Sequence, residues 1–205
     1  ARNSYIHKSF GKERAGAFIM SNEKRFSCTA KSKQPFTFRV TIYDNAASPN
    51  IVDVSTVNIC SARDSLLTDT LSVGGKKYIW RVLAYPNSYD ASETAYDFQL
   101  SSPSKVGDSP QVSLQVIGRD ADIELYRMSG YMFPHALDPV LDAGDCRYTI
   151  FSPSSSPDVI CVGSTSYRTQ FVNYLGEKKV YDSGRNGIRS PFSAMGPTLD
   201  GRIKP

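Results

Sequence analysis

The sequence predicts an all-β protein whose main part is an antiparallel, jelly-roll-like β-sandwich. Between residues 16 and 130, short runs in which apolar and polar residues alternate are separated by clusters of turn-forming residues. No strong helical periodicity is found in that range. Alternation with a period of two is the pattern of a strand with one buried face and one solvent-exposed face. About eight or nine such runs are enough for two packed antiparallel sheets.

The clearest strand is Phe36–Tyr43, which follows Pro35 and ends before Asp44. Its even-numbered positions are all apolar, and its odd-numbered positions are Thr, Arg, Thr and Tyr. Because successive side chains of a strand point to opposite faces, we expect the even-numbered ones to face a core and the odd-numbered ones to face water.

The other predicted strands have the same short alternation. In chain order they are Phe18–Met20, Phe26–Cys28, Val52–Ser55 continued by Val57–Ile59, Leu71–Val73, Tyr78–Leu83, Tyr96–Leu100, Val112–Val116 and Ile123–Tyr126. The pair Gly74-Gly75 predicts a tight hairpin, because glycine adopts the positive φ values of such a turn without strain.

The pattern changes after residue 140. Val159–Val162 is a continuous apolar run that ends at Gly163, and it predicts a strand covered on both faces, as in a parallel sheet. Within this run, Cys161 is expected to be a small buried apolar group. The residues after this run are glycine-rich and irregular, so we expect those after about residue 164 to be mobile or to borrow contacts from a neighbouring copy.

Charge is distributed unevenly along the chain. The formal net charge is +4, but residues 1–39 carry nine Lys or Arg against two Glu, and residues 86–145 carry ten Asp or Glu against three Lys or Arg. The basic segment lacks the dense patch and stacking aromatic residues of a nucleic-acid site, so nucleic-acid binding is not predicted. No apolar run approaches the ~20 residues that cross a bilayer, so no membrane span is predicted.

The four cysteines are Cys28, Cys60, Cys146 and Cys161. None of them belongs to a C-x-x-C pair, which argues against zinc and thioredoxin-like sites. A Cys28–Cys60 disulfide is compatible with the sequence, but the spacing of cysteines does not determine their pairing.

Two acidic pairs, Asp120-x-Asp122 and Asp142-x-x-Asp145, offer oxygen ligands of the kind that Ca²⁺ prefers. Neither pair fits a known calcium loop, so we interpret them as solvated turn carboxylates, with calcium binding as the alternative. The sequence otherwise predicts no cofactor.

Trp80, Tyr78 and Tyr85 suggest two uses. Trp80 and Tyr78 share a face of their strand, so the group would form either a sugar-stacking platform or part of the core, and we favour the core.

The two histidines, His7 and His135, are interpreted as surface or hydrogen-bonded structural residues. Gly163-Ser-Thr-Ser166 has some likeness to a nucleophile motif, but we interpret it as a turn at the end of a strand.

Three segments resemble the subtilisin-like serine peptidases. The most specific is Gly196–Pro205, which lies within Ser193-x-x-Gly-Pro-Thr-x-Asp-Gly-Arg-Ile-Lys-Pro and is similar to a stretch shortly before the nucleophilic serine of that family. Ile150–Gly163 is similar to a proline-containing loop that leads into a buried strand ending in Val-Gly. Ala1–His7 is similar to the residues directly after the Ala-Gly-Asn oxyanion segment of the family.

In one branch of this family, which includes the clostridial germination proteases, a jelly-roll domain is inserted between the oxyanion asparagine and the Val-Gly strand. The strands predicted between residues 16 and 130 occupy the same place. The resemblance therefore implies three parts: a catalytic-domain flank at 1–15, an inserted sandwich at 16–140, and a second flank of the α/β catalytic domain at 141–205 that ends before the nucleophile.

The resemblance also implies a parent protein that hydrolyses peptide bonds with an Asp-His-Ser triad. It places the Asp, the His and the oxyanion Asn before Ala1 and the Ser after Pro205. No catalytic, cofactor-binding or metal-binding residue is therefore assigned in this sequence, and we expect the chain alone to be inactive.

The partners that the resemblance implies are the missing catalytic core and, through it, a polypeptide substrate. The sandwich would act as a lid, a brace or a substrate-selecting element, and the protein would be secreted or belong to the cell envelope. The alternative is a glycan- or protein-binding sandwich of a degenerate protease.

Overall fold

The computed structural model describes residues 5–8, 14–43, 51–59, 65–107, 110–118, 121–145, 147–150, 153–181, 184–198 and 201–203. The chain divides into two compact units. The sandwich unit is Asn3–Asp145, and the tail unit is Cys146–Pro205 together with Ala1–Arg2.

Strands are the regular elements of both units, and none of the described residues is helical. The strands of the sandwich unit are β1 (Tyr5–Lys8), β2 (Arg14–Met20), β3 (Arg25–Ser32), β4 (Phe36–Tyr43), β5 (Ile51–Ile59), β6 (Ser65–Val73), β7 (Lys76–Pro86), β8 (Thr94–Ser101), β9 (Gln111–Ile117), β10 (Ile123–Ser129) and β11 (Tyr131–Phe133). The tail unit contains β12 (Gln170–Val172) and β13 (Lys178–Val180).

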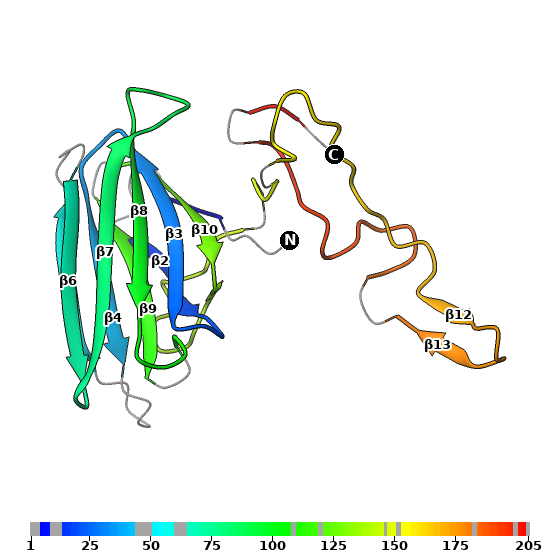
Figure 1. Ribbon diagram of the computed structural model, residues 1–205, viewed down its shortest axis with the longest axis horizontal. Helices are drawn as coiled ribbons and strands as arrows, with labels where there is room; N and C mark the ends of the chain where they lie inside the picture. Colours follow the sequence, from blue (N-terminus) through cyan, green and yellow to red (C-terminus); the bar gives the residue numbers. More distant parts are fainter. Residues whose placement is uncertain are drawn as a thin grey trace. The chain divides into compact units, whose positions relative to one another are not determined.

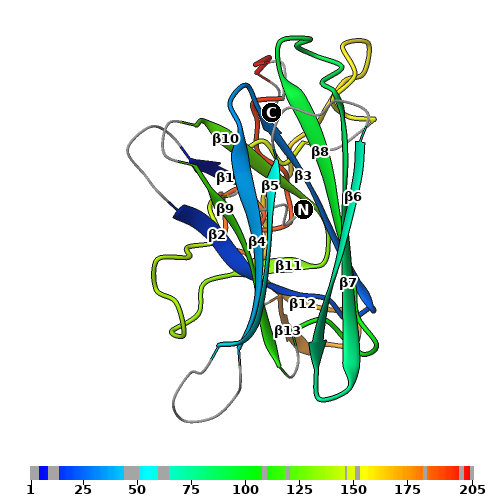
Figure 2. The same ribbon diagram turned by 90° about the vertical axis from the view of Figure 1, so that its left-hand side faces the viewer.

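The sandwich unit has two antiparallel sheets that lie face to face (Figures 1 and 2). The six-stranded sheet has the order β1-β10-β3-β8-β7-β6, and the five-stranded sheet has the order β11-β2-β9-β4-β5. Neighbours far apart in sequence, such as β3 with β10 and β4 with β9, show that the chain crosses between the sheets repeatedly. The predicted all-β antiparallel sandwich is confirmed.

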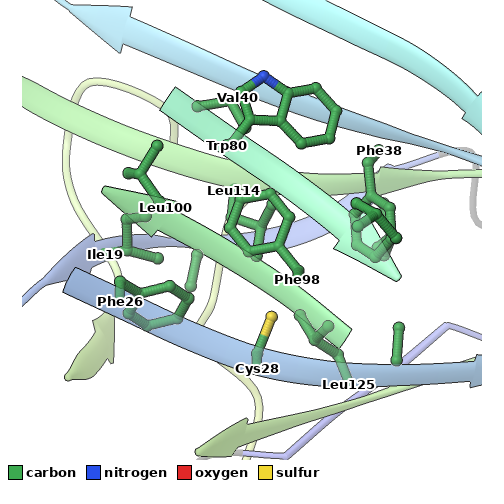
Figure 3. Packing of buried hydrophobic residues seen from close by; sticks show 14 of the residues in the cluster. Ile19, Phe26, Cys28, Phe38, Val40, Trp80, Phe98, Leu100, Leu114 and Leu125 are labelled. Carbon is green, nitrogen blue, oxygen red and sulfur yellow. The ribbon is translucent and has the colours of Figure 1, made fainter. Parts of the chain in front are cut away.

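The core lies between the two sheets and follows from the alternation in the sequence. On β7 the side chains of Tyr78, Trp80 and Val82 are buried, and the residues between them are exposed. Phe98 of β8 lies near the middle, with ring centroids 5.5 Å from Trp80 and 5.6 Å from Phe38 (Figure 3). Side chains from both sheets thus meet in one aromatic and aliphatic layer, as expected for packed sheets.

The outer face of the five-stranded sheet is also covered, by the loop segment 134–145, which we call the covering loop. Phe18, Tyr43 and Leu141 form a second buried cluster there. The expectation that all odd-numbered side chains of β4 face water is therefore wrong: Thr41 and Tyr43 are buried. A second layer on a sheet face is a tertiary contact that strand alternation alone does not encode.

The hairpin at Gly74-Gly75 is confirmed. Both glycines have positive φ, 55° and 75°, and they join β6 to β7 in register from Val73↔Lys76 onward. The strands that we did not predict, β1, β11, β12 and β13, are three or four residues long.

The tail unit is built from loops and the β12–β13 hairpin (Figure 1). The predicted buried strand at Val159–Val162 is wrong. Its residues belong to no strand, and Ile160 is 90% exposed and Val162 82% exposed. An apolar run forms a buried strand only where neighbouring strands cover it, and the described part of the tail unit supplies none. Across the described residues, no helix has the length and apolar character needed to cross a membrane.

Candidate functional site

The aromatic residues of β7 do not form a sugar-binding platform. The side chains of Trp80 and Tyr78 are buried on the inner face of the sheet, so the preferred interpretation as core residues is correct. Tyr85 lies on the other face, and burial, with a further contribution from the charge of Asp97, raises its pKa. A platform made of these residues is therefore excluded.

His135 has a structural environment in the covering loop. Its ring lies 5.0 Å from the ring of Phe18, and its Nδ1 accepts a hydrogen bond from the Leu137 N–H at 3.2 Å. His7 is opposite Glu124 in the pairing of β1 with β10, and its side chain lies outside the described residues.

A part-buried, bidentate ion pair fixes the covering loop on the sheet. Arg14 of β2 donates to both carboxylate oxygens of Asp138, at 2.5 and 3.0 Å, and also to Gln115 at 3.2 Å. Tyr43 donates to the same carboxylate at 3.4 Å. Bidentate pairing and additional hydrogen bonds compensate the desolvation of buried charges, so this network is a structural clamp.

Three of the four acidic residues considered for calcium, Asp122, Asp142 and Asp145, are described. Asp142 accepts the Gly144 N–H at 3.0 Å, as a turn carboxylate does, and Asp120 lies outside the described residues. Among the residues that are described, no group of three or more His, Cys, Asp or Glu side chains is placed to hold a metal ion.

Cys28 is a free, buried thiol, so the disulfide considered between Cys28 and Cys60 is not formed. Burial raises the pKa of the Cys28 thiol well above its usual value, and the negative charge of Asp97 raises it further. Cys161 is also free and is only half-buried, contrary to the expectation that it lies in a core.

A polar cavity of about 260 Å³ lies beside the turns that join β2 to β3 and β10 to β11. The Arg127 guanidinium lies 5.8 Å above the Tyr131 ring and donates to the Gly130 carbonyl. The residues lining the cavity are Ser21, Asn22, Glu23, Arg127, Ser129, Gly130 and Tyr131. The arginine holds the β10–β11 connection, and we assign no chemistry to it.

The serines of Gly163–Ser166 form structural links within the tail unit. Thr165 makes an isolated β-bridge with Arg189, so this segment is extended and the predicted turn is wrong. The hydroxyls of Ser164 and Ser166 lie 3.2 and 3.1 Å from the hydroxyl of Ser190. These contacts connect two stretches of loop.

The segment that carries the most specific sequence motif is a closed loop. The Thr198 N–H donates to the Arg202 carbonyl and the Gly201 N–H donates to the Thr198 carbonyl, both at 2.9 Å. The Arg202 side chain donates to the Ser155 carbonyl at 2.7 Å, which ties the loop to the stretch before Val159. The described residues of this segment are thus joined to one another, and to Ser155, by hydrogen bonds.

The described residues of the tail unit include many exposed apolar side chains, and we call this set the tail apolar surface. Tyr174 and Ile203 are 94% and 93% exposed. Its members are Val159, Ile160, Val162, Tyr167, Phe171, Val172, Tyr174, Leu175, Val180, Tyr181, Ile188, Phe192 and Ile203. Large exposed apolar patches mark interaction sites in folded proteins, so this set of side chains is a candidate interaction surface. Three of these side chains, those of Val159, Ile160 and Val162, belong to the apolar run that we predicted to be a covered strand.

Comparison with models of protein families gives no match, and no curated protein matches the sequence. Among solved structures, the chain is similar to the Clostridium perfringens CspB protease, with a TM-score of 0.50 and 14% sequence identity. The alignment covers 96% of this chain and 37% of that chain. At this identity the likeness shows a shared fold. It extends over both units, and this chain spans little more than a third of the length of that protease.

Proposed function

We propose that this chain is a segment of a subtilisin-like serine endopeptidase. The observation that carries the proposal is the extent of the fold likeness: 96% of the chain, and hence both units, aligns within a single chain of a protease. A free-standing sandwich would be expected to match through the sandwich unit alone.

The tail unit supports the proposal because it is incomplete as a folded body. An isolated two-stranded hairpin is marginally stable in water, and every residue of β12 and β13 is exposed. The tail apolar surface needs cover, and we propose that the remainder of the catalytic domain supplies it. In this proposal residues 1–15 and 141–205 are parts of the catalytic domain, and residues 16–140 are an insertion.

The closed loop at residues 198–202 is the part of the tail unit closest to the proposed chemistry. By the resemblance, the nucleophilic serine follows Pro205. In such a triad the serine attacks the scissile carbonyl, the histidine takes its proton, and the aspartate orients the imidazole. The contribution of this chain would be positional, because its loop would lead the backbone to the nucleophile.

We further propose that the sandwich acts as a lid, a brace or a substrate-selecting element beside the catalytic domain. The substrate would be a polypeptide, and the protein would be secreted or belong to the cell envelope. The proposal includes no cofactor.

A probe that reacts covalently with activated serines tests the proposal. The 205-residue chain and the protein encoded by the complete reading frame are each treated with a fluorophosphonate and assayed for polypeptide hydrolysis. We expect the longer protein to be labelled and active, its serine-to-alanine variant to be neither, and the chain alone to be neither.

Labelling of the chain by itself would overturn the proposal, because no triad is assigned within it. A longer protein that is folded but remains unlabelled and inactive would instead favour the degenerate-protease alternative.

A further inference from the structure

Strand β6 is a long, weakly charged edge of the six-stranded sheet. Among the described strands it pairs with β7 alone and ends the sheet. The strand at the opposite end, β1, has four residues; at the two ends of the other sheet, β11 has three and β5 has nine. β6 has nine residues, Ser-Leu-Leu-Thr-Asp-Thr-Leu-Ser-Val, and Asp69 is its one charged side chain. Natural sheets blunt their edges with short strands or charges, since an unprotected edge recruits other chains.

The hydrogen bond at the centre of β6 shows which backbone groups face outward. The Thr70 N–H donates to the Asp69 carboxylate at 2.7 Å, although Thr70 lies opposite Ile79 in the pairing with β7. This N–H therefore points away from β7. Because alternate residues of a strand direct their backbone groups to the same side, those of Thr68 and Ser72 also face the open edge.

The sequence of β6 is self-complementary in an antiparallel arrangement. If a second copy of the strand pairs with it about Asp69, Leu67 lies opposite Leu71 and Thr68 opposite Thr70. Thr–Thr cross-strand pairs are favourable, whereas Leu71 is already buried in the core of its own copy. Exposed Leu66, paired with exposed Leu83, would extend the apolar face of the joined sheets.

The same register places Asp69 directly opposite its own copy. Asp69 would occupy a non-hydrogen-bonded position of the new ladder, where the Cα atoms approach to about 4.5 Å and side chains are closest. Like charges directly opposite destabilise a pair of strands. Its carboxylate also occupies the Thr70 N–H, which the second copy would need as a donor.

We propose that β6 is a pairing edge for a second copy of this chain and that Asp69 keeps it closed. Asp69 acts in two ways. Its carboxylate accepts the hydrogen bond of the Thr70 N–H, which a second copy would need, and its charge repels the Asp69 of a second copy that pairs in this register. The inference rests on the sandwich unit and does not depend on the proposed protease function.

The test is the self-association of the 205-residue chain carrying Asp69→Val, measured by sedimentation equilibrium against wild type. We expect the association constant to rise at least about tenfold, since the substitution removes the cap and the repulsion together. The matched control is Thr68→Val, which adds a valine to the same strand and keeps the carboxylate; its association should equal that of wild type. The tail apolar surface is the same in all variants, so it contributes a common baseline.

A second substitution locates the contact. Proline lacks an N–H and cannot donate to an added strand, and it is tolerated at edge positions whose N–H faces solvent. Asp69→Val with Thr70→Pro should therefore associate as wild type does. Hydrogen exchange of Asp69→Val alone gives an independent reading: the Thr68 and Ser72 amides should become protected as protein concentration rises. An unchanged association constant for Asp69→Val, or association without protection of these amides, would overturn the proposal.

Discussion

Single residues show how strongly the sandwich depends on its central aromatic layer. Phe98 contacts Trp80, Phe38 and Phe26, with ring centroids 5.5 to 6.5 Å apart. Its side chain is fully buried, so removing the ring loses its transfer free energy and leaves a cavity.

We predict that Phe98→Ala lowers the free energy of unfolding by about 3–5 kcal/mol. Urea denaturation followed by fluorescence measures this, because Trp80 is the one tryptophan of the chain. Ile79→Ala, an exposed position on the neighbouring strand, is the control and should cost less than about 1 kcal/mol. Equal losses for the two variants would contradict the assignment of Phe98 to the centre of the core.

Asp90 supplies a prediction for pH. The Ser92 hydroxyl and N–H donate to its carboxylate at 2.7 and 2.9 Å, and with Lys33 they lower the pKa of Asp90 to about 2. A lowered folded-state pKa means that the stabilisation is present above the ordinary value near 3.8 and is lost as the pH falls toward 2. In an NMR titration the carboxyl carbon should therefore titrate near pH 2. Ser92→Ala should move the midpoint upward, and an unmoved midpoint would show that the hydroxyl is not the main cause.

At the scale of elements, the turn between β6 and β7 requires a residue that can adopt a positive φ. Gly74 has a φ of 55°, and a Cβ atom added there would meet no atom within 4 Å. A substitution is thus limited by backbone conformation and not by a clash.

We predict that Gly74→Val lowers the free energy of unfolding by about 1–2 kcal/mol, because a β-branched residue is strained at positive φ. Gly74→Asn should change the free energy of unfolding by less than about 0.5 kcal/mol, since asparagine is well tolerated in two-residue hairpin turns with positive φ. Thermal or urea unfolding of both variants makes the comparison, and a similar loss for asparagine and valine would argue against the positive φ as the cause.

Elements also show how much the sequence could predict. Strands with strict alternation, such as β4 and β7, were predictable because the two-sheet core imposes that period on every strand that crosses it. The burial of Thr41 and Tyr43 was not predictable, because it depends on a loop that returns about ninety residues later to cover the outer face. The exposure of Ile160 was not predicted either. An apolar run indicates that burial would be favourable, but it does not show whether other elements are present to cover it.

At the scale of the whole molecule, the two units differ in self-sufficiency. Both buried clusters draw their members from residues between Ala15 and Ala143. The described tail residues contribute no member to either cluster, and their apolar side chains lie largely exposed. If the tail unit packs against the rest of a catalytic domain, a polar substitution on the tail apolar surface should leave the stability of the 205-residue chain unchanged. The same substitution should destabilise the longer protein, in which the surface would be covered.

We predict that Ile160→Asp changes the unfolding of the 205-residue chain by less than about 0.5 kcal/mol, because the side chain is exposed. In the protein from the complete reading frame it should cost more than about 3 kcal/mol, since a charge would then be buried without a partner. Val140→Asp, an exposed position of the sandwich unit, serves as the control and should be tolerated in both. Tolerance of Ile160→Asp in the longer protein would indicate that this part of the tail apolar surface is never covered.

The buried thiol of Cys28 can report how often the sandwich opens. It lies on β3 in the aromatic layer and is buried, so a reagent can alkylate it only when the two sheets separate (Figure 3). With Cys60, Cys146 and Cys161 replaced by serine, the alkylation rate should follow the population of fully opened molecules and rise with urea as steeply as global unfolding does. An alkylation rate that is insensitive to urea would show that a local fluctuation exposes Cys28 while the rest of the sandwich stays folded.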